Sequence, residues 1–297
     1  MQQAQSNLDK EALSFMQALA DELAGGKVEL PSYPEAAMRV QRALSADEVD
    51  LDLVIRAISA EPLLAVRVLQ MANSVLFNSM GRQVSDLRTA VMRLGYNVVR
   101  TAAMAFIVQQ LLNKTDFGPL KPQLAALWQR SIALAALSRV VARRRSRLNA
   151  DVALLAGLLH GIGRLCIHVR LAAHPALQTQ PEVCTRILEE WQTDIAAALL
   201  TDWGMSEDLV DAVRFYSDDQ RVTSAGVDLT DVLSAAAQLG TLREQLADAV
   251  PSVEAALPLL EADLRFWQRL DIDAEAVLLL LAEAEEAIDE LNTVLGG

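Results

Sequence analysis

The sequence predicts an all-α fold, and three observations support this prediction. Apolar side chains make up 52% of the 297 residues and aromatic ones only 4%, and the abundant Ala and Leu lose little side-chain freedom in a helix. Apolar residues recur at spacings of three and four, and no segment alternates long enough to suggest a strand. The chain is also long enough to bury a substantial core, so we expect it to be folded.

The first third of the chain is expected to form short helices with recognisable start and stop signals. Asp50 and Ser85 are the expected N-caps, Pro62 fits a first turn, and Gly95 is an expected stop. A first helix is expected over residues 8–23 and is followed by a hinge at Gly25-Gly26. A second helix follows the extended segment 30–34 and ends near residue 44. Three more are expected over 50–58, 62–74 and 85–95.

Longer helices are expected in the rest of the chain. They cover residues 96–113, 121–145, 151–172, 182–202 (as one helix or two), 206–217, 229–248, 252–269 and 274–293. Leu257, Leu260, Leu264 and Trp267 form an apolar stripe, so we expect 252–293 to pack on the body.

Four parts of the chain are distinguished by composition and by breaks. Gly118, Pro119 and Pro122 separate two long helices and mark the best internal boundary. The predicted division is an N-terminal helix with a Gly-Gly hinge (1–26), an N-terminal helical subdomain (27–117), a central helical subdomain (118–250) and an acidic C-terminal helical extension (251–297).

The net charge of -13 is unevenly distributed. Residues 1–181 hold 20 Lys and Arg against 14 Asp and Glu, whereas residues 182–297 hold 6 against 25. The acidic part disfavours nucleic acid lying across it, because phosphates would be repelled there. A local basic patch in the first part remains compatible with these numbers.

The sequence also suggests where the protein is located and whether its cysteines are oxidised. The opening residues lack the basic and apolar segments of an export leader, and the most apolar stretches are interrupted by Arg139, His160 or Glu283. We therefore expect a cytoplasmic protein without a membrane span. Cys166 and Cys184 show no CxxC spacing and are expected to be buried free thiols.

Four segments resemble, in order, the motifs of the HDOD family, whose members are HD-related output domains. They are residues 30–34 (LPSYP), 58–62 (ISAEP), 68–74 (VLQMANS) and 157–163 (GLLHGIG). The resemblance implies a multi-helix bundle with an HD-like central part, here with extra C-terminal helices, and a role in bacterial regulation. The motif residues, expected to be structural, are Pro31, Pro34, Pro62, Asn73, Ser74, Gly95, Trp128, Gly157 and Gly163.

The same resemblance implies that the metal site of the HD phosphohydrolases is lost. Such a hydrolase needs several His and Asp ligands around its metal ions, with an adjacent His-Asp pair at the centre. Here Gly161 follows His160, and Arg130 stands where relatives carry a histidine. Phe215-Tyr216 falls where relatives often have paired histidines, and Ala235-Ala236-Ala237 falls where a later helix would supply an aspartate. We therefore assign no catalytic residue, no metal ligand and no cofactor.

Two readings of the degenerate site remain open. Arg130, His160, Gly161 and Arg164 could form a vestigial cleft for an anion such as a phosphate, a nucleotide or a partner's carboxylate. Alternatively, Arg130 pairs with a local carboxylate and fills the old metal space. The expected function is a non-enzymatic signalling module that binds another signalling protein or a small ligand.

Two other functions compete with this expectation. One is residual metal-dependent phosphohydrolase or phosphodiesterase activity through an unrecognised set of ligands. The other is nucleic-acid or nucleotide binding through the basic run from Arg139 to Arg147. That run lacks interleaved aromatic residues, and its alternative role is to dock the acidic C-terminal part, so we consider nucleic acid an improbable partner.

Overall fold

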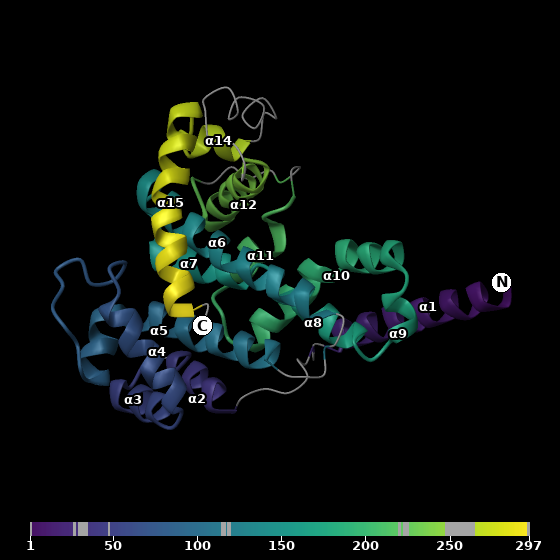
Figure 1. The fold of residues 1–297 in the computed structure, drawn as a ribbon, viewed down its shortest axis with the longest axis horizontal. Helices are drawn as coiled ribbons and strands as arrows, with labels where there is room; N and C mark the ends of the chain where they lie inside the picture. The colour runs from purple at the N-terminus through teal and green to yellow at the C-terminus, as the bar shows by residue number, and fades with distance from the viewer. Residues whose placement is uncertain are drawn as a thin grey trace.

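The computed structural model describes residues 2–25, 28, 35–46, 48–113, 117, 120–218, 221, 226–246 and 265–295. Within these ranges the regular elements are helices and no strand occurs, which confirms the all-α fold class (Figure 1). The helices are α1 (Gln2–Ala24), α2 (Glu35–Leu44), α3 (Leu51–Ser59), α4 (Pro62–Asn73), α5 (Leu87–Leu112), α6 (Lys121–Arg145), α7 (Ala150–Leu159), α8 (Ile162–Leu171), α9 (Pro175–Gln178), α10 (Pro181–Asp202), α11 (Glu207–Phe215), α12 (Leu229–Gln245), α14 (Arg265–Arg269) and α15 (Ala274–Leu295).

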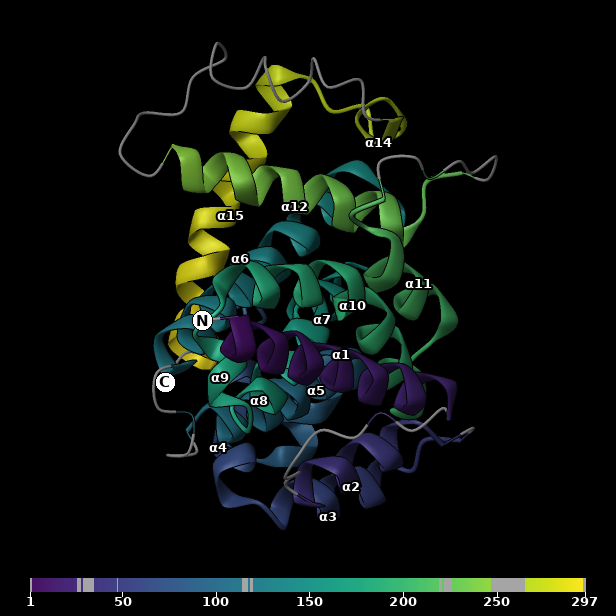
Figure 2. The same ribbon diagram turned by 90° about the vertical axis from the view of Figure 1, so that its right-hand side faces the viewer.

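Helices α6 and α7 form the centre of the bundle. α5, α11 and α12 pack on α7, and α12 and α15 also pack on α6. α2, α3 and α4 gather against α5 at one end, while α8, α9, α10 and α1 form the opposite arm, with the N-terminus at its tip (Figure 1). Figure 2 shows α12 lying across the bundle above α10, beside the long α15. The central helices therefore receive packing partners from both ends of the chain.

Several helix ends follow the signals in the sequence. The Asp50 carboxylate accepts hydrogen bonds from the backbone N–H of Asp52 at 2.8 Å and of Leu53 at 3.3 Å, as an N-cap does. Pro62 occupies the first turn of α4, as predicted. At the end of α4, the Asn73 amide exchanges hydrogen bonds with the backbone of Val84 at 2.7 and 2.8 Å. Asn73 therefore has a structural role that ties two chain segments together.

One expectation around α5 needs revision and one is confirmed. The N-cap is Asp86 and not Ser85, because the Asp86 carboxylate accepts from the Thr89 N–H at 2.8 Å. Gly95 has a non-helical φ of 76°, so the predicted stop is confirmed, and α5 consists of two helical stretches that meet there at a kink. Glycine tolerates this positive φ because it has no Cβ.

The predicted helix over residues 151–172 is wrong in one respect, because the chain breaks it into α7 and α8 at His160-Gly161. Gly161 has φ of −87° and ψ of 5°, outside the helical range, and the His160 imidazole bonds back to the Gly157 carbonyl. Conversely, α10 runs without a break, and the short α9 before it was not predicted.

The C-terminal helices pack on the body, as expected for residues 265–295. Trp267 is buried, as are Leu280, Leu281 and Leu291 of α15. Residues 252–264 lie outside the described residues, as do Gly26 and the segment 30–34 with Pro31 and Pro34. The division of the chain into four parts remains a prediction.

Three helical stretches are long and apolar enough to cross a membrane by length and composition, contrary to our expectation from the sequence. They are Leu87–Leu112, Lys121–Arg145 and Ala150–Leu171. In each of them, 61–78% of the most apolar window is buried against the rest of the protein. Both cysteines are free; Cys166 is buried as expected, whereas Cys184 is only partly buried.

Candidate functional site

Close helix packing sets the frame of the site. A Cβ at Gly157 would lie 2.5 Å from the Leu134 carbonyl oxygen, so α7 can approach α6 only through glycine. A Cβ at Gly163 would lie 1.9 Å from the Gln192 carbonyl oxygen, which imposes the same requirement between α8 and α10. The packing role predicted for Gly157 is thus confirmed, and Gly163 has one as well.

A hollow of about 230 Å³ lies beside the α7–α8 break; we call it the His160 hollow. Its walls come from α6, from the α7–α8 break, from α12 and from Tyr216, the residue that follows α11. Its lining consists of Arg130, Ala133, Leu134, His160, Tyr216, Ala237, Gly240, Thr241, Arg243 and Glu244. Arg130 and His160 therefore share one space with Tyr216 and Ala237, one residue from each of the two other segments compared with ligand positions. The other members of those segments, Phe215, Ala235 and Ala236, do not line it.

Arg130 makes a two-point ion pair across this hollow. Its Nε and Nη2 donate to the two carboxylate oxygens of Glu244 at 2.8 and 2.9 Å. Both side chains are about half exposed, so the pair contributes modestly to stability. The pairing with a carboxylate was one of the two readings of Arg130. Its partner lies 114 residues away in the sequence, and no local pattern could have identified it.

His160 is held as a neutral imidazole. Its Nδ1 lies 2.7 Å from the Gly157 carbonyl oxygen and donates to it, which leaves Nε2 without a proton. Burial lowers the pKa of His160 to about 4, the bond to Gly157 opposes this shift, and the charges of Arg164 and Arg130 add to it. The ring also meets Tyr216 edge to face, with centroids 5.8 Å apart. His160 therefore does not carry charge at neutral pH.

This depressed pKa predicts a pH-dependent stability. The unfolded chain takes up a proton on His160 near pH 6.5 and the folded one only near pH 4, so stability is lost as pH falls through that window. We expect the parent to lose up to about 3 kcal/mol more than His160→Gln between these pH values. Urea unfolding at a series of pH values measures this difference. Parallel pH profiles for the two proteins would contradict it.

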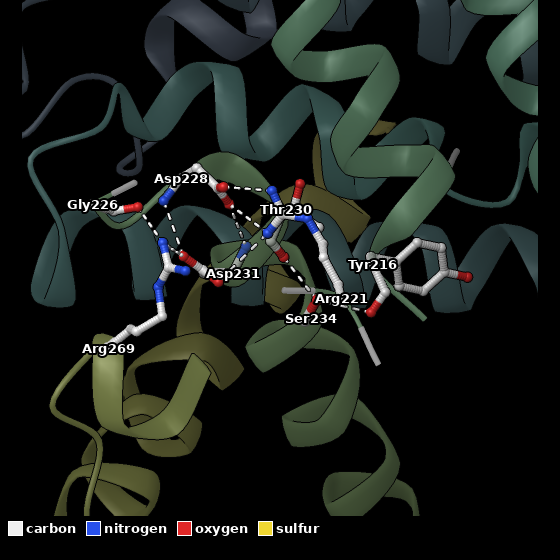
Figure 3. Close-up of polar contacts among 8 residues, drawn as sticks. All are labelled: Tyr216, Arg221, Gly226, Asp228, Thr230, Asp231, Ser234 and Arg269. Atoms are coloured by element: carbon white, nitrogen blue, oxygen red, sulfur yellow. Dashed lines mark hydrogen bonds and ion pairs between the residues drawn. The ribbon is translucent and has the colours of Figure 1, made fainter. Parts of the chain in front are cut away.

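An ion network fixes the start of α12 and, through it, Tyr216 (Figure 3). Asp228 and Asp231 form a capping box, in which each carboxylate accepts from the other residue's N–H at 3.0 Å. Arg221 pairs with Asp228 at 2.5 Å, and Arg269 of α14 pairs with Asp231 at 2.9 Å. One turn later, the Ser234 hydroxyl lies 2.8 Å from the Tyr216 carbonyl oxygen and donates to it.

The two carboxylates of this capping box differ in their protonation equilibria. Burial raises the pKa of Asp231, whose side chain is only 7% exposed. Burial would also raise the pKa of Asp228, but the hydrogen bond from Arg221 and the backbone bond from Asp231 outweigh it and lower that pKa. The network thus serves to anchor α12.

The residues around the His160 hollow do not fit a divalent metal ion. One imidazole is present, the neighbouring position is Gly161, and the nearby carboxylate of Glu244 is already held by Arg130. Across the described ranges, no three His, Cys, Asp or Glu side chains are grouped so that they could hold a metal. A catalytic metal needs several such ligands and an open position, and this geometry supplies neither.

Arg164 does not line the His160 hollow, so the predicted single cleft is divided in two. Arg164 lines a second space of about 420 Å³, between the start of α6, α8, α9 and α10, which we call the α8–α10 hollow. Arg130 belongs to the walls of both. No pattern in the sequence assigned the other polar residues of the second hollow, among them His168, Gln178 and Thr185, to a common site.

Two further family-motif positions among the described residues, Trp128 and Ser74, have structural roles in this fold. Trp128 is buried in α6 with an exposed fraction of 5%, and Ser74 donates to the Met71 carbonyl at the end of α4. A Cβ at Gly161 would lie 3.0 Å from Leu127 Cδ1 and 3.3 Å from Ser131 Oγ, so a larger residue would press on α6.

The basic run at the end of α6 is occupied by the acidic C-terminal part. Arg143 and Arg144 both pair with Glu283 of α15, and Arg145 donates to the Asp271 carbonyl at 2.9 Å. Arg139 pairs with Asp151 at 3.3 Å and lies over the Phe77 ring. Burial raises the pKa of Glu283, but the hydrogen bonds from Arg143 and Arg144 dominate and lower it overall. These contacts show the basic run docking the acidic C-terminal part, which was the alternative to binding nucleic-acid phosphate.

Comparison with known proteins agrees with the all-α fold. A crystal structure from Shewanella amazonensis SB2B, provisionally named a metal-dependent phosphohydrolase, matches with a TM-score of 0.68 at 24% identity, over 95% of this chain and 99% of that one. One from Marinobacter aquaeolei VT8, provisionally named a signal transduction protein, matches with a TM-score of 0.61 at 22% identity, over 96% and 65%. At these identities the likeness concerns the fold.

The sequence comparisons extend this result. An uncharacterized protein of Treponema pallidum (strain Nichols) is 25% identical over 212 residues, which are 67% of this chain and 39% of that protein. This chain therefore spans well under half of that relative's length. The model of the HDOD domain matches residues 30–218, which include the four motif segments and the α7–α8 break. The chain belongs to the HDOD domain family.

Proposed function

We propose that this chain is a non-catalytic regulatory module that acts by binding another signalling protein or a small anionic ligand in the cytoplasm. One observation carries the proposal: the position that resembles a metal ligand is Arg130, and its guanidinium is held by Glu244 inside the hollow. By the resemblance to the HD hydrolases, this cation paired with a carboxylate stands at a position where such a hydrolase would have a metal ligand. A single neutral imidazole, His160, remains beside it.

The competing functions gain less support. Phosphohydrolase activity would need further ligands, which the described residues around His160 do not supply. Nucleic-acid binding would need the arginines at the end of α6, but Arg143 and Arg144 already share Glu283. Binding without catalysis is therefore the function that the geometry supports best.

The proposal predicts that the purified protein carries no stoichiometric metal. Elemental analysis by mass spectrometry should give well under one transition metal ion per chain, because guanidinium repels cations and one imidazole binds them weakly. Hydrolysis of bis(p-nitrophenyl) phosphate with added Mn²⁺ should not exceed the rate without protein. The same measurements on His160→Ala form the control. A tightly bound metal or a hydrolytic activity that this substitution removes would overturn the proposal.

A further inference from the structure

The α8–α10 hollow has the size of a small-molecule site. Its volume of about 420 Å³ lies within the range of roughly 300–1,000 Å³ that ligand pockets occupy. It is separate from the His160 hollow and shares only Arg130 with it. Its walls come from four helices, two of which, α8 and α10, are held together by the close contact at Gly163. The hollow is thus built into a rigid part of the fold.

The polar wall of this hollow is positive. Among the described residues, its lining contains the cations Arg130 and Arg164 and no Asp or Glu side chain, and burial and Arg164 lower the pKa of the third nitrogen-bearing group, His168. Arg164 Nε donates to the amide oxygen of Gln192 at 2.9 Å, which fixes the guanidinium plane. Among the described residues, its terminal nitrogens have no hydrogen-bond acceptor and remain able to donate to a ligand.

The rest of the wall is mainly apolar. The side chains concerned are Leu120, Ala126, Leu127, Leu171, Pro181 and Leu188. Arg164 and Arg130 differ in availability, because two donors of Arg130 are committed to Glu244 whereas Arg164 is oriented by a neutral amide. Arg164 is therefore the main anion-binding group, and the apolar wall can take the body of the same ligand.

We propose that the α8–α10 hollow binds a small organic anion with an apolar body, whose carboxylate or phosphate head is bound by Arg164. Guanidinium groups bind both kinds of head through two parallel N–H donors. This proposal rests on the binding function proposed above. The metal and hydrolysis measurements do not involve this hollow, so the two proposals can fail separately.

Calorimetric titration with four probes tests the proposal. Octanoate and octyl phosphate carry the two anionic heads, octan-1-ol has the same apolar body without charge, and inorganic phosphate is a head alone. At least one amphipathic anion should bind the parent, roughly tenfold more tightly than octan-1-ol or phosphate, because charge-assisted hydrogen bonds and apolar burial both contribute. The tighter of the two anions identifies the head group.

Variants of this chain localise the binding. Arg164→Ala should weaken the better anion by roughly tenfold or more, while Arg186→Ala, which removes an exposed arginine of α10 outside the hollow, should change its affinity by less than about twofold. Leu188→Trp keeps every charge but fills the hollow, and it should also abolish binding. This second variant keeps the test decisive if Arg164→Ala is poorly folded, which circular dichroism reports.

Cys184 provides an independent reporter because it lines the hollow, whereas Cys166 is buried in the core. Burial raises the pKa of Cys184, so alkylation by N-ethylmaleimide is best followed at mildly alkaline pH. A saturating anion should slow the alkylation of Cys184 in the parent and not in Arg164→Ala. No binding by either anion, equal binding of octan-1-ol, or affinity that both hollow variants leave unchanged would overturn the proposal.

Discussion

Replacing Gly163 by alanine is expected to lower the free energy of unfolding by about 3 kcal/mol or more, because overpacking against backbone is among the most costly substitutions. The new Cβ would lie 1.9 Å from the Gln192 carbonyl oxygen and 2.8 Å from the Ala196 nitrogen. Both atoms belong to the backbone of α10, which no rotamer change can move aside. Helices α8 and α10 would have to separate, and their buried side chains would lose contacts.

Gly240 provides the matched control for this experiment. It lies inside α12, and a Cβ there would meet Leu137 Cδ1 at an ordinary 3.6 Å. Gly240→Ala should therefore stabilise the protein by up to about 1 kcal/mol, because alanine is the better helix former. Urea unfolding followed by circular dichroism measures both variants. If Gly163→Ala unfolds at the same urea concentration as the parent, the close approach of α8 to α10 is wrong.

The second large effect is expected in α15, where two neighbouring leucines differ sharply in burial. Leu280 is 2% exposed and Leu279 is 69% exposed. Leu280→Ala should lower the free energy of unfolding by about 2–5 kcal/mol, because it leaves a cavity in the packed core. Leu279→Ala should change it by no more than about 0.5 kcal/mol.

The comparison within this pair separates packing from helix propensity, since both substitutions replace leucine by alanine in one helix. The same urea unfolding assay applies. Equal losses for Leu279→Ala and Leu280→Ala would mean that α15 contributes to stability only through its helical conformation. A large difference would show that the C-terminal helix belongs to the core.

Local signals in the sequence predicted the helices well where one residue decides the end. Asp50 and Pro62 mark the starts of α3 and α4, and the predicted range 121–145 coincides with α6. The signals were insufficient where two neighbouring residues are both good N-caps, as at the start of α5, where Ser85 was expected and Asp86 is the cap. They also missed the break at His160-Gly161, because the apolar periodicity continues through it and the hydrogen bond of His160 to Gly157 is a property of the fold.

The site was predictable only in part for a related reason. Resemblance to a known family singled out Arg130, His160 and the segments 215–216 and 235–237. Of these, Arg130, His160, Tyr216 and Ala237 line one hollow. The partner of Arg130 could not be foreseen, because Glu244 is one of many acidic residues in the C-terminal part and reaches Arg130 only through the packing of α12 on α6. The separation of Arg164 into another hollow depends in the same way on how α8 is oriented after the break.

Arg130 belongs to the walls of both hollows. Glu244 and any anion in the α8–α10 hollow therefore compete for the hydrogen-bond donors of its guanidinium. Competition for one group gives an unfavourable, positive coupling free energy, which is negative cooperativity, and such coupling acts equally in both directions. An anion that draws Arg130 away weakens the link between α6 and α12, and whatever strengthens that link lowers the affinity for the anion. Arg243, the residue next to Glu244, pairs with Glu285 of α15, so the last helix of the described chain shares in this balance.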